Sequence, residues 1–267
     1  MGIAVVVLTH NRVHLLQQCV ANVLSRTSPA TREILVWNNG STDGTADYLD
    51  SLTDHRLRVV HHPQNIGQSA YADAFRLTTS EFLVDLDDDV IAAPDGWDLL
   101  LLDAFRRLPE VGFLAADLEP NEHDPASVTR HNVRPHLYVP FELNGVRLLD
   151  GPAGGGCAMT SRDIYERAGG FKEHKKQVFF LEDQAYIQDV KRLGYRAAVL
   201  ADLRVFHAGG PYYSQQPPEK IEYWARELRL QRRKDAVKRA LLRVPLVRRL
   251  NRTFGWFFEP ATERAAR

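Results

Sequence analysis

The sequence predicts an α/β fold with a mostly parallel, doubly wound central sheet, helices on both faces and a C-terminal helical extension. Short apolar runs rich in β-branched residues alternate with segments of helical spacing throughout residues 1–118. These runs are continuously apolar, which is typical of strands buried on both faces. The chain has 267 residues, of which 44% are hydrophobic, enough to bury one large core.

The first half supplies the alternating elements in order. Residues 3–8 form an unbroken apolar run, and the next apolar residues follow the spacing of one helix face at residues 16–24. Asn-Gly-Ser-Thr-Asp-Gly at 39–44 has the chemistry of a turn. The expected strands are 3–8, 34–37, 57–61, 82–86 and 111–118, and the expected helices are 16–24, 45–52, 68–77 and 97–108.

The second half is less regular. Residues 119–144 are rich in Pro, His, Asn and Asp and are interpreted as a long, functional excursion. A Gly-rich segment at 149–156 precedes expected helices near 161–168 and 181–193 and a late strand at 195–206. The organisation expected from these patterns is one half of a domain at 1–118, the other half of the same domain at 119–218, and a basic helical segment at 219–267.

Composition excludes several classes of protein. Lys+Arg and Asp+Glu are both 34, whereas a general nucleic-acid binder has a basic excess. Two cysteines, Cys19 and Cys157, cannot build a disulfide scaffold, and no Cys/His zinc spacing is present. No stretch approaches the roughly 18 apolar residues of a membrane span, and no basic residue precedes the first apolar run as in a signal peptide. A cytoplasmic location is expected.

An acidic cluster gives the strongest local signal. Asp85, Asp87, Asp88 and Asp89 follow a run that should be buried, and four carboxylates this close repel one another unless a cation or solvent compensates. Hard oxygen ligands suit Mg2+ or Mn2+. A solvated acidic turn before the next helix is the alternative. His207, at the end of the late strand, is a candidate third ligand, although a lone histidine is more often structural.

Other polar residues also lie at expected strand ends, where doubly wound sheets bind ligands. Thr9 to Arg12 follow the first strand and Asn38-Asn39 follow the second. Glu182-Asp183 opens a helix beside apolar residues, and either caps its first turn or supplies a general base. Gly154-Gly155-Gly156 lets the backbone approach a ligand, but neither a P-loop nor a GxGxxG after the first strand is present.

The order of these motifs resembles the family-2 glycosyltransferases of the GT-A fold over roughly residues 3–210. The matching segments are Val5 to Arg12, Trp37 to Thr45, Asn65-Ile66-Gly67, Asp87-Asp88-Asp89 as the DxD motif, Gly154 to Met159 with Ala168 to Phe171, Leu181-Glu182-Asp183, and Gly194-Tyr195 with His207. The resemblance implies a metal-dependent, inverting transfer of a sugar from a nucleotide-diphosphate sugar. It also implies that 1–118 is the nucleotide-sugar-binding half and 119–218 the acceptor-binding and catalytic half of the same domain.

The resemblance also implies roles for individual residues. Asp183 would be the catalytic base, and Glu182 would support the acceptor or the helix start. Asp87 and Asp89 would hold Mn2+ or Mg2+ on the donor diphosphate, with His207 as a further ligand. The residues implied to bind the donor are Thr9, Asn11 and Arg12 in the nucleotide pocket, Asn38 or Asn39 at the base, Gly67, Asp87, and Asp88 at the ribose or sugar.

The chain departs from the family pattern in several places. Asn38-Asn39 stand where acidic residues are common, and Ala72-Asp73 stand where Ala-Arg-Asn is common. No Gln-x-x-Arg-Trp motif follows Glu182-Asp183, which favours addition of a single sugar over processive synthesis.

UDP- or dTDP-sugars are the favoured donors. A glycan, a lipid-linked sugar, a natural product or a protein remains open as the acceptor.

Two rival functions and one partner surface remain open at this point. A sugar nucleotidyltransferase should carry a Gly-rich phosphate loop, which Thr9 to Arg12 is not. A catalytically silent nucleotide-sugar-binding module would not need intact carboxylates at Asp87, Asp89 and Asp183.

Residues 220–252 carry twelve Lys/Arg against three Asp/Glu. The stretch 219–258 is either a helix with a solvated basic face or a peripheral contact with the inner face of a membrane.

Overall fold

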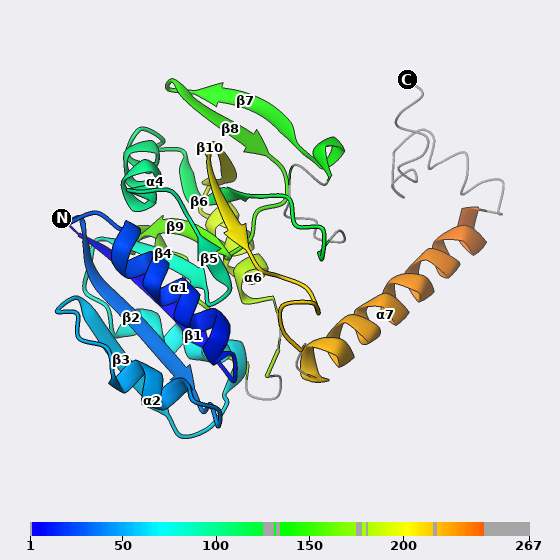
Figure 1. Cartoon of the computed structure of the whole chain (residues 1–267). Coiled ribbons are helices and arrows are strands. Elements are labelled where there is room, and N and C mark those ends of the chain that lie inside the picture. The colour runs from blue at the N-terminus through cyan, green and yellow to red at the C-terminus, as the bar shows by residue number, and fades with distance from the viewer. Residues whose placement is uncertain are drawn as a thin grey trace. The chain divides into compact units, whose positions relative to one another are not determined.

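The computed structural model describes residues 2–124, 131, 134–174, 178–179, 181–215 and 218–242. The chain divides into two compact units, Met1–Gln216 and Pro217–Arg267. In the first unit, helices lie on both faces of a central sheet, as expected (Figure 1). Its helices are α1 Val13–Arg26, α2 Thr45–Asp50, α3 Ala70–Arg76, α4 Trp97–Arg106, α5 Arg162–Arg167 and α6 Glu182–Arg192, with short 3-10 turns at Gly67–Ser69 and Pro135–Leu137.

The sheet has ten strands, nine of them in the order β3-β2-β1-β4-β9-β6-β10-β8-β7, and β5 pairs with β10 off this path. Their bounds are β1 Ile3–Thr9, β2 Thr31–Asn39, β3 Leu57–His62, β4 Phe82–Asp87, β5 Val90–Ala92, β6 Val111–Leu118, β7 Val139–Leu143, β8 Val146–Asp150, β9 Cys157–Ser161 and β10 Arg196–His207. Strand β1 lies between β2 and β4 in parallel register, and residues 3–7 are completely buried. The apolar run predicts this position because both faces of β1 are covered.

The sheet is more mixed than the sequence suggests. Strands β1 to β4 pair in parallel, and so do β6 and β10, but β9 runs antiparallel between β4 and β6. The expected excursion is in part a β7–β8 hairpin that extends the sheet beyond β10. Its turn is Asn144-Gly145, both with positive φ (51° and 70°). Asn-Gly is the strongest short hairpin signal, so the sequence did carry this information.

A fully buried carboxylate holds α4 to the loop between α1 and β2. Asp98, in the first turn of α4, accepts hydrogen bonds from Ser28 N (2.9 Å), Ser28 Oγ (2.7 Å) and Thr31 Oγ1 (2.8 Å). We expect Asp98→Ala to lower the free energy of unfolding by about 3 kcal/mol, because it leaves buried donors without acceptors. The exposed Arg26–Asp95 ion pair provides the control, and Asp95→Ala should cost less than about 1 kcal/mol. Urea denaturation of both variants measures the difference, and equal midpoints would contradict it.

The second unit contains one described helix, α7 Pro218–Leu242. Its exposed apolar side chains form two stripes rather than one. Ile221, Trp224 and Leu228 follow i, i+3, i+7, whereas Leu230, Val237 and Leu241 follow i, i+7, i+11 on roughly the opposite side. No helix in the described ranges is both long enough and apolar enough to cross a membrane. The rest of the predicted basic segment, residues 243–267, lies outside these ranges.

Candidate active site

Strand pairing brings His207 to the acidic cluster. Asp87 ends β4 and Asp89 immediately precedes β5, while His207 ends β10, which pairs antiparallel with β5. The backbone N–H of Ala208 donates to the carbonyl of Asp89 at 2.7 Å. His207 Nε2 therefore lies 3.2 Å from Asp87 Oδ2 and 3.0 Å from Asp89 Oδ1. Residues 120 positions apart thus meet at one point of the sheet.

The three side chains fit a divalent cation. One ligand atom from each of Asp87, Asp89 and His207 lies within 4.8 Å of the others. Two carboxylate oxygens and one imidazole nitrogen are a donor set suited to Mn2+ or Mg2+. Asp89 is buried and Asp87 is half-exposed, so the cluster opens toward solvent on the Asp87 side. The structure thus brings together the three residues that the sequence predicts as metal ligands, and binding of a metal stays a prediction.

The charges in this cluster are strongly coupled. Burial disfavours the His207 imidazolium, but Asp89 and Asp87 outweigh that effect and raise the pKa of His207 to about 10. Burial likewise opposes ionisation of Asp89, yet His207 and Arg12 lower its pKa. Burial raises the pKa of Asp88 to about 6, although Arg12 opposes that rise. Without a cation, His207 and Arg12 supply the charge that the aspartates need.

Arg12 contacts the carboxylates directly. Its guanidinium donates to Asp88 Oδ1 and Asp89 Oδ2, each at 2.6 Å, and to Ser214 Oγ at 3.1 Å. Thr9 Oγ1 donates to the other oxygen of Asp88 at 2.7 Å. Two residues predicted for the nucleotide pocket therefore also fix the orientation of the acidic cluster. Ser214 carries no motif in the sequence, so only the fold reveals its contact.

The remaining predicted nucleotide residues organise the loops at the ends of β1 and β2. Asn11 accepts from the Thr42 N–H (2.7 Å), and its own N–H donates to Ser41 Oγ (3.0 Å). Asn38 is buried, lies 3.0 Å from His61 Nδ1 through its Nδ2, and accepts from the Ser41 N–H. Both loops are thus tied together. Recognition of a base by these residues stays a prediction.

Asn39 and Gly67 join this region to the segment before α6. The buried Asn39 amide donates to the carbonyl of Gly67 at 3.1 Å and accepts from the Ile66 N–H. Gly67 has a φ of +64°, and a Cβ there would lie 1.8 Å from the carbonyl oxygen of Val178. Only glycine allows this close approach of two backbones. The loop 65–67 therefore lies against the chain that leads into Glu182-Asp183.

Asp183 is held in place by the Gly-rich segment. Gly155 N donates to Asp183 Oδ2 at 3.0 Å, and Gln184 N donates to Oδ1 at 2.6 Å. Burial raises the pKa of Asp183, and these backbone hydrogen bonds oppose the rise. Glu182 is the first residue of α6 and is buried, and burial together with Asp183 raises its pKa well above the ordinary value. Its position at the start of α6 matches the predicted helix-start role.

The same segment lies close to both Asp183 and the cation ligands. A Cβ on Gly156 would lie 3.3 Å from Asp87 Oδ2 and 3.7 Å from the His207 ring. On Gly155 it would lie 3.4 Å from the Asp183 side chain. The carbonyl of Gly156 accepts from the Asp87 N–H at 3.0 Å. Residues 155–156 thus contact both a candidate base and a candidate cation site.

We expect Gly155→Ala to disturb Asp183. A Cβ there would lie 2.4 Å from Oδ2 of the buried Asp85, so the loop that holds Asp183 must shift. Asp85 was noted in the sequence only as part of the acidic cluster, and its contact with Gly155 was missed. Gly44→Ala is the matched control, because nothing lies within 4 Å of a Cβ at Gly44. Turnover should fall at least about tenfold in Gly155→Ala and stay unchanged in Gly44→Ala. Equal turnover in the two variants would contradict this expectation.

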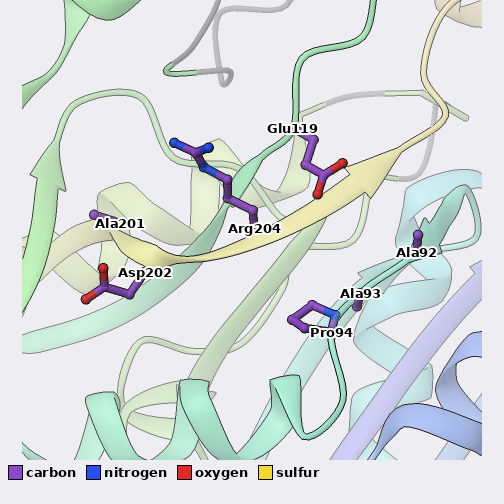
Figure 2. Close-up of a pocket in the computed structure, with 7 residues that line it drawn as sticks. All are labelled: Ala92, Ala93, Pro94, Glu119, Ala201, Asp202 and Arg204. Atoms are coloured by element: carbon purple, nitrogen blue, oxygen red, sulfur yellow. The ribbon is translucent and has the colours of Figure 1, made fainter.

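A separate open hollow of about 590 Å³ runs along β5 and β10 (Figure 2). None of the residues predicted for the site lines it. Arg204 Nε lies 3.4 Å from Asp117 Oδ2 and Arg147 pairs with Asp202, so charged side chains at the hollow have ionic partners. The lining residues are Ala92, Ala93, Pro94, Glu119, Ala201, Asp202 and Arg204. The predicted chemistry is therefore concentrated at the carboxylate cluster and not in this hollow.

Comparison with known proteins places these features in a family. The uncharacterized protein y4gI of Sinorhizobium fredii is 24% identical over 250 residues, which cover 87% of this chain but only 27% of that relative. A mannosyltransferase from Pyrobaculum calidifontis, solved with GDP-Man and Mn2+, is similar with a TM-score of 0.57 and 22% identity. The match covers 77% of this chain and 56% of the mannosyltransferase chain. TarS 1–349 of S. aureus, solved with UDP-GlcNAc, is similar with a TM-score of 0.56 and 17% identity. The match covers 81% of this chain and 62% of the TarS chain.

These structural similarities show a common fold. The family model of glycosyl transferase family 2 matches residues 4–169, a range that contains the acidic cluster and the Gly-rich segment. The match covers more than half of the chain. The chain belongs to glycosyltransferase family 2.

Proposed function

We propose that this chain transfers a single sugar from a nucleotide-diphosphate sugar to an acceptor hydroxyl, with inversion at the anomeric carbon. One observation carries the proposal: the cation-ligand set and Asp183 both lie against residues 155–156. Such a site can hold a leaving diphosphate at the cation and deprotonate a nucleophile at Asp183. Membership of glycosyltransferase family 2 favours this function over the nucleotidyltransferase and the silent binding module.

Asp87, Asp89 and His207 would hold the cation, whose charge stabilises the negative charge that develops on the leaving diphosphate. Arg12 and Thr9 keep Asp88 and Asp89 in position. Asp183 takes the proton of the acceptor hydroxyl, and that oxygen bonds to the anomeric carbon as the bond from that carbon to the diphosphate oxygen breaks. Attack from the side opposite the diphosphate inverts the configuration.

Solved proteins of the same fold support the donor class. The Pyrobaculum mannosyltransferase was solved with GDP-Man and Mn2+, and TarS with UDP-GlcNAc. For this chain we propose a UDP- or dTDP-sugar, Mn2+ or Mg2+, and a glycan, lipid-linked, natural-product or protein acceptor. Peripheral membrane contact through 219–258 remains a prediction. The two apolar stripes of α7 lie on opposite sides, so a helix lying on a membrane surface would leave one stripe in water, which weighs against this contact.

Release of nucleoside diphosphate tests the proposed activity. The purified full chain is incubated with UDP-, dTDP-, GDP- and CDP-sugars, a panel of pyranoside acceptors and MnCl2 or EDTA. We expect release from one donor class that requires both the cation and an acceptor, with the opposite anomeric configuration in the product by NMR. Retained configuration would contradict inversion, and equal rates in EDTA would contradict metal dependence.

A further inference from the structure

Four aromatic rings gather next to His207, a candidate metal ligand. His123 stacks on Tyr212 with ring centroids 3.7 Å apart and an interplanar angle of 12°. Tyr213 stands edge-on to both rings, at 5.5 Å from His123 and 5.0 Å from Tyr212. Phe206, the residue before His207, packs edge-on against Tyr213, with ring centroids 6.1 Å apart. The rings come from β10 and from the segments after β6 and β10, so the fold assembles this cluster from distant parts of the chain.

The cluster is fixed to the candidate site by hydrogen bonds. The buried Asn121 amide donates to the carbonyls of His207 (3.1 Å) and Gly209 (3.0 Å), and its oxygen accepts from the His123 N–H. Ser214, two residues after Tyr212, accepts from Arg12, which binds Asp89. The stacked pair is therefore held in place by contacts that begin at the cation ligands.

Tyr212 is far more exposed than a packing role requires. It is 70% exposed, although one face of its ring lies against His123. An aromatic stack usually forms in a core, where burial of the rings supplies most of its free energy. Here the structure fixes the ring and leaves much of it in water. A fixed, exposed aromatic ring with carboxylates nearby is suited to a ligand that has one apolar face and several hydroxyls.

We propose that the stacked pair His123–Tyr212 binds the apolar C–H face of a pyranose ring at the rim of the active site. The negative face of an aromatic ring attracts the weakly positive C–H groups of a sugar face. Glu122, whose side chain is 87% exposed and lies 3.5 Å from His123 Nε2, offers a carboxylate to the sugar hydroxyls. This inference rests on the proposed function for the identity of the ligand as a sugar.

The strands that lead into this subsite differ from those that begin the nucleotide half, which it meets through Ser214 and Arg12. Strands β1, β2 and β3 lie on one side of β4, whereas β6 and β10, which lead into His123 and Tyr212, lie on the other. The pyranose could belong to the acceptor or to the donor, since both carry the same ring chemistry. The nucleobase end of the donor is expected at the β1 and β2 ends, so free nucleotide binding should not depend on Tyr212.

Saturation-transfer NMR tests the subsite without turnover. The probes are the methyl glycosides of glucose, galactose, mannose and N-acetylglucosamine, added to the full chain without nucleotide and again with UDP and MnCl2. We expect transfer to the C–H protons of one ring face for at least one probe. Tyr212→Ala should weaken that binding by about fivefold, and Tyr212→Trp should preserve it. Leu100→Ala, which removes a 46% exposed side chain from α4, is the control and should change nothing.

The outcomes distinguish the sources of the sugar. A raised KM for the acceptor pyranoside alone in Tyr212→Ala assigns the subsite to the acceptor, and a raised KM for the nucleotide sugar with unchanged UDP affinity assigns it to the donor. Absence of transfer to every probe, equal transfer in Tyr212→Ala, or weakened binding of UDP itself would overturn the proposal. Tyr212-dependent pyranoside binding in a protein with no detectable transfer would instead count against the proposed function.

Discussion

Asp183→Asn is expected to lower kcat by about 10²- to 10⁴-fold while the affinity for the nucleotide sugar stays within about twofold. Asparagine can keep only one of the hydrogen bonds from Gly155 N and Gln184 N, because these groups donate to different oxygens of Asp183 and the amide has a single acceptor oxygen. It also cannot take a proton from an acceptor hydroxyl. The loss should therefore fall on the chemical step. Initial rates of nucleoside diphosphate release and donor titration calorimetry measure the two effects separately.

Asp163→Asn is the matched control, because Asp163 is an exposed helix carboxylate paired with Arg167 on the surface. It should leave kcat unchanged. If kcat of Asp183→Asn stays within threefold of the wild-type value, Asp183 is not the catalytic base. Loss of donor affinity along with kcat would mean that Asp183 positions the donor instead. A protein with no measurable turnover before the substitution would support the silent binding module.

The pH profile of the wild type should reflect the same carboxylate. Burial raises the pKa of Asp183 above its ordinary value of 3.8, and only the ionised form can accept the hydroxyl proton. The rate should therefore begin to fall, as pH is lowered, at a higher pH than an exposed aspartate would give. The residual rate of Asp183→Asn should lack this acid limb. An acid limb retained unchanged in the variant would assign it to another group.

Arg12→Gln is expected to lower the free energy of unfolding by about 3 kcal/mol. The substitution removes the guanidinium from Asp88 and Asp89, both of which are buried, and breaking a buried ion pair from one side leaves charge without compensation. Arg12→Lys should recover part of the loss, because it keeps the charge but cannot bridge two carboxylates with a planar fork. Urea denaturation without divalent cations measures all three proteins.

The exposed ion pair of Arg26 with Asp95 provides the comparison for Arg12, and Arg26→Gln should cost less than about 1 kcal/mol. Added MnCl2 should stabilise Arg12→Gln, since a bound cation would replace part of the missing charge. An Arg12→Gln variant as stable as the wild type would show that the carboxylates do not depend on Arg12.

The strand–helix alternation and the acidic motif could be predicted from the sequence because their signals are local. The run at 3–8 and the cluster ending at Asp89 each lie within one short segment. The partners of Arg12 could not be predicted, because Asp88 and Ser214 are 76 and 202 residues away and meet it only through the folded sheet. The resemblance assigns Arg12 to the nucleotide pocket, which stays a prediction, and the structure adds its contacts with two carboxylates.

The position of His207 in the site also could not be predicted from local sequence. Its residue type and its place after an apolar run made it a candidate, but only the antiparallel pairing of β5 with β10 brings it to Asp87 and Asp89. The register of β10 shifts between Leu200 and Arg204, so no count along the sequence gives the position of His207 in the sheet. Long-range pairing, rather than local propensity, determines this part of the site.

A thermal-shift titration with UDP, dTDP, GDP and CDP, each with MnCl2 or with EDTA, tests the central claim most directly. A ligand that binds only the native state raises its stability. If Asp87, Asp89 and His207 hold a cation on the diphosphate, one nucleotide class will raise the melting temperature in Mn2+ but not in EDTA, and Asp89→Asn will abolish that rise. A rise that is equal in EDTA and in Asp89→Asn, or no rise with any nucleotide, would contradict a cation-dependent donor site at these three residues.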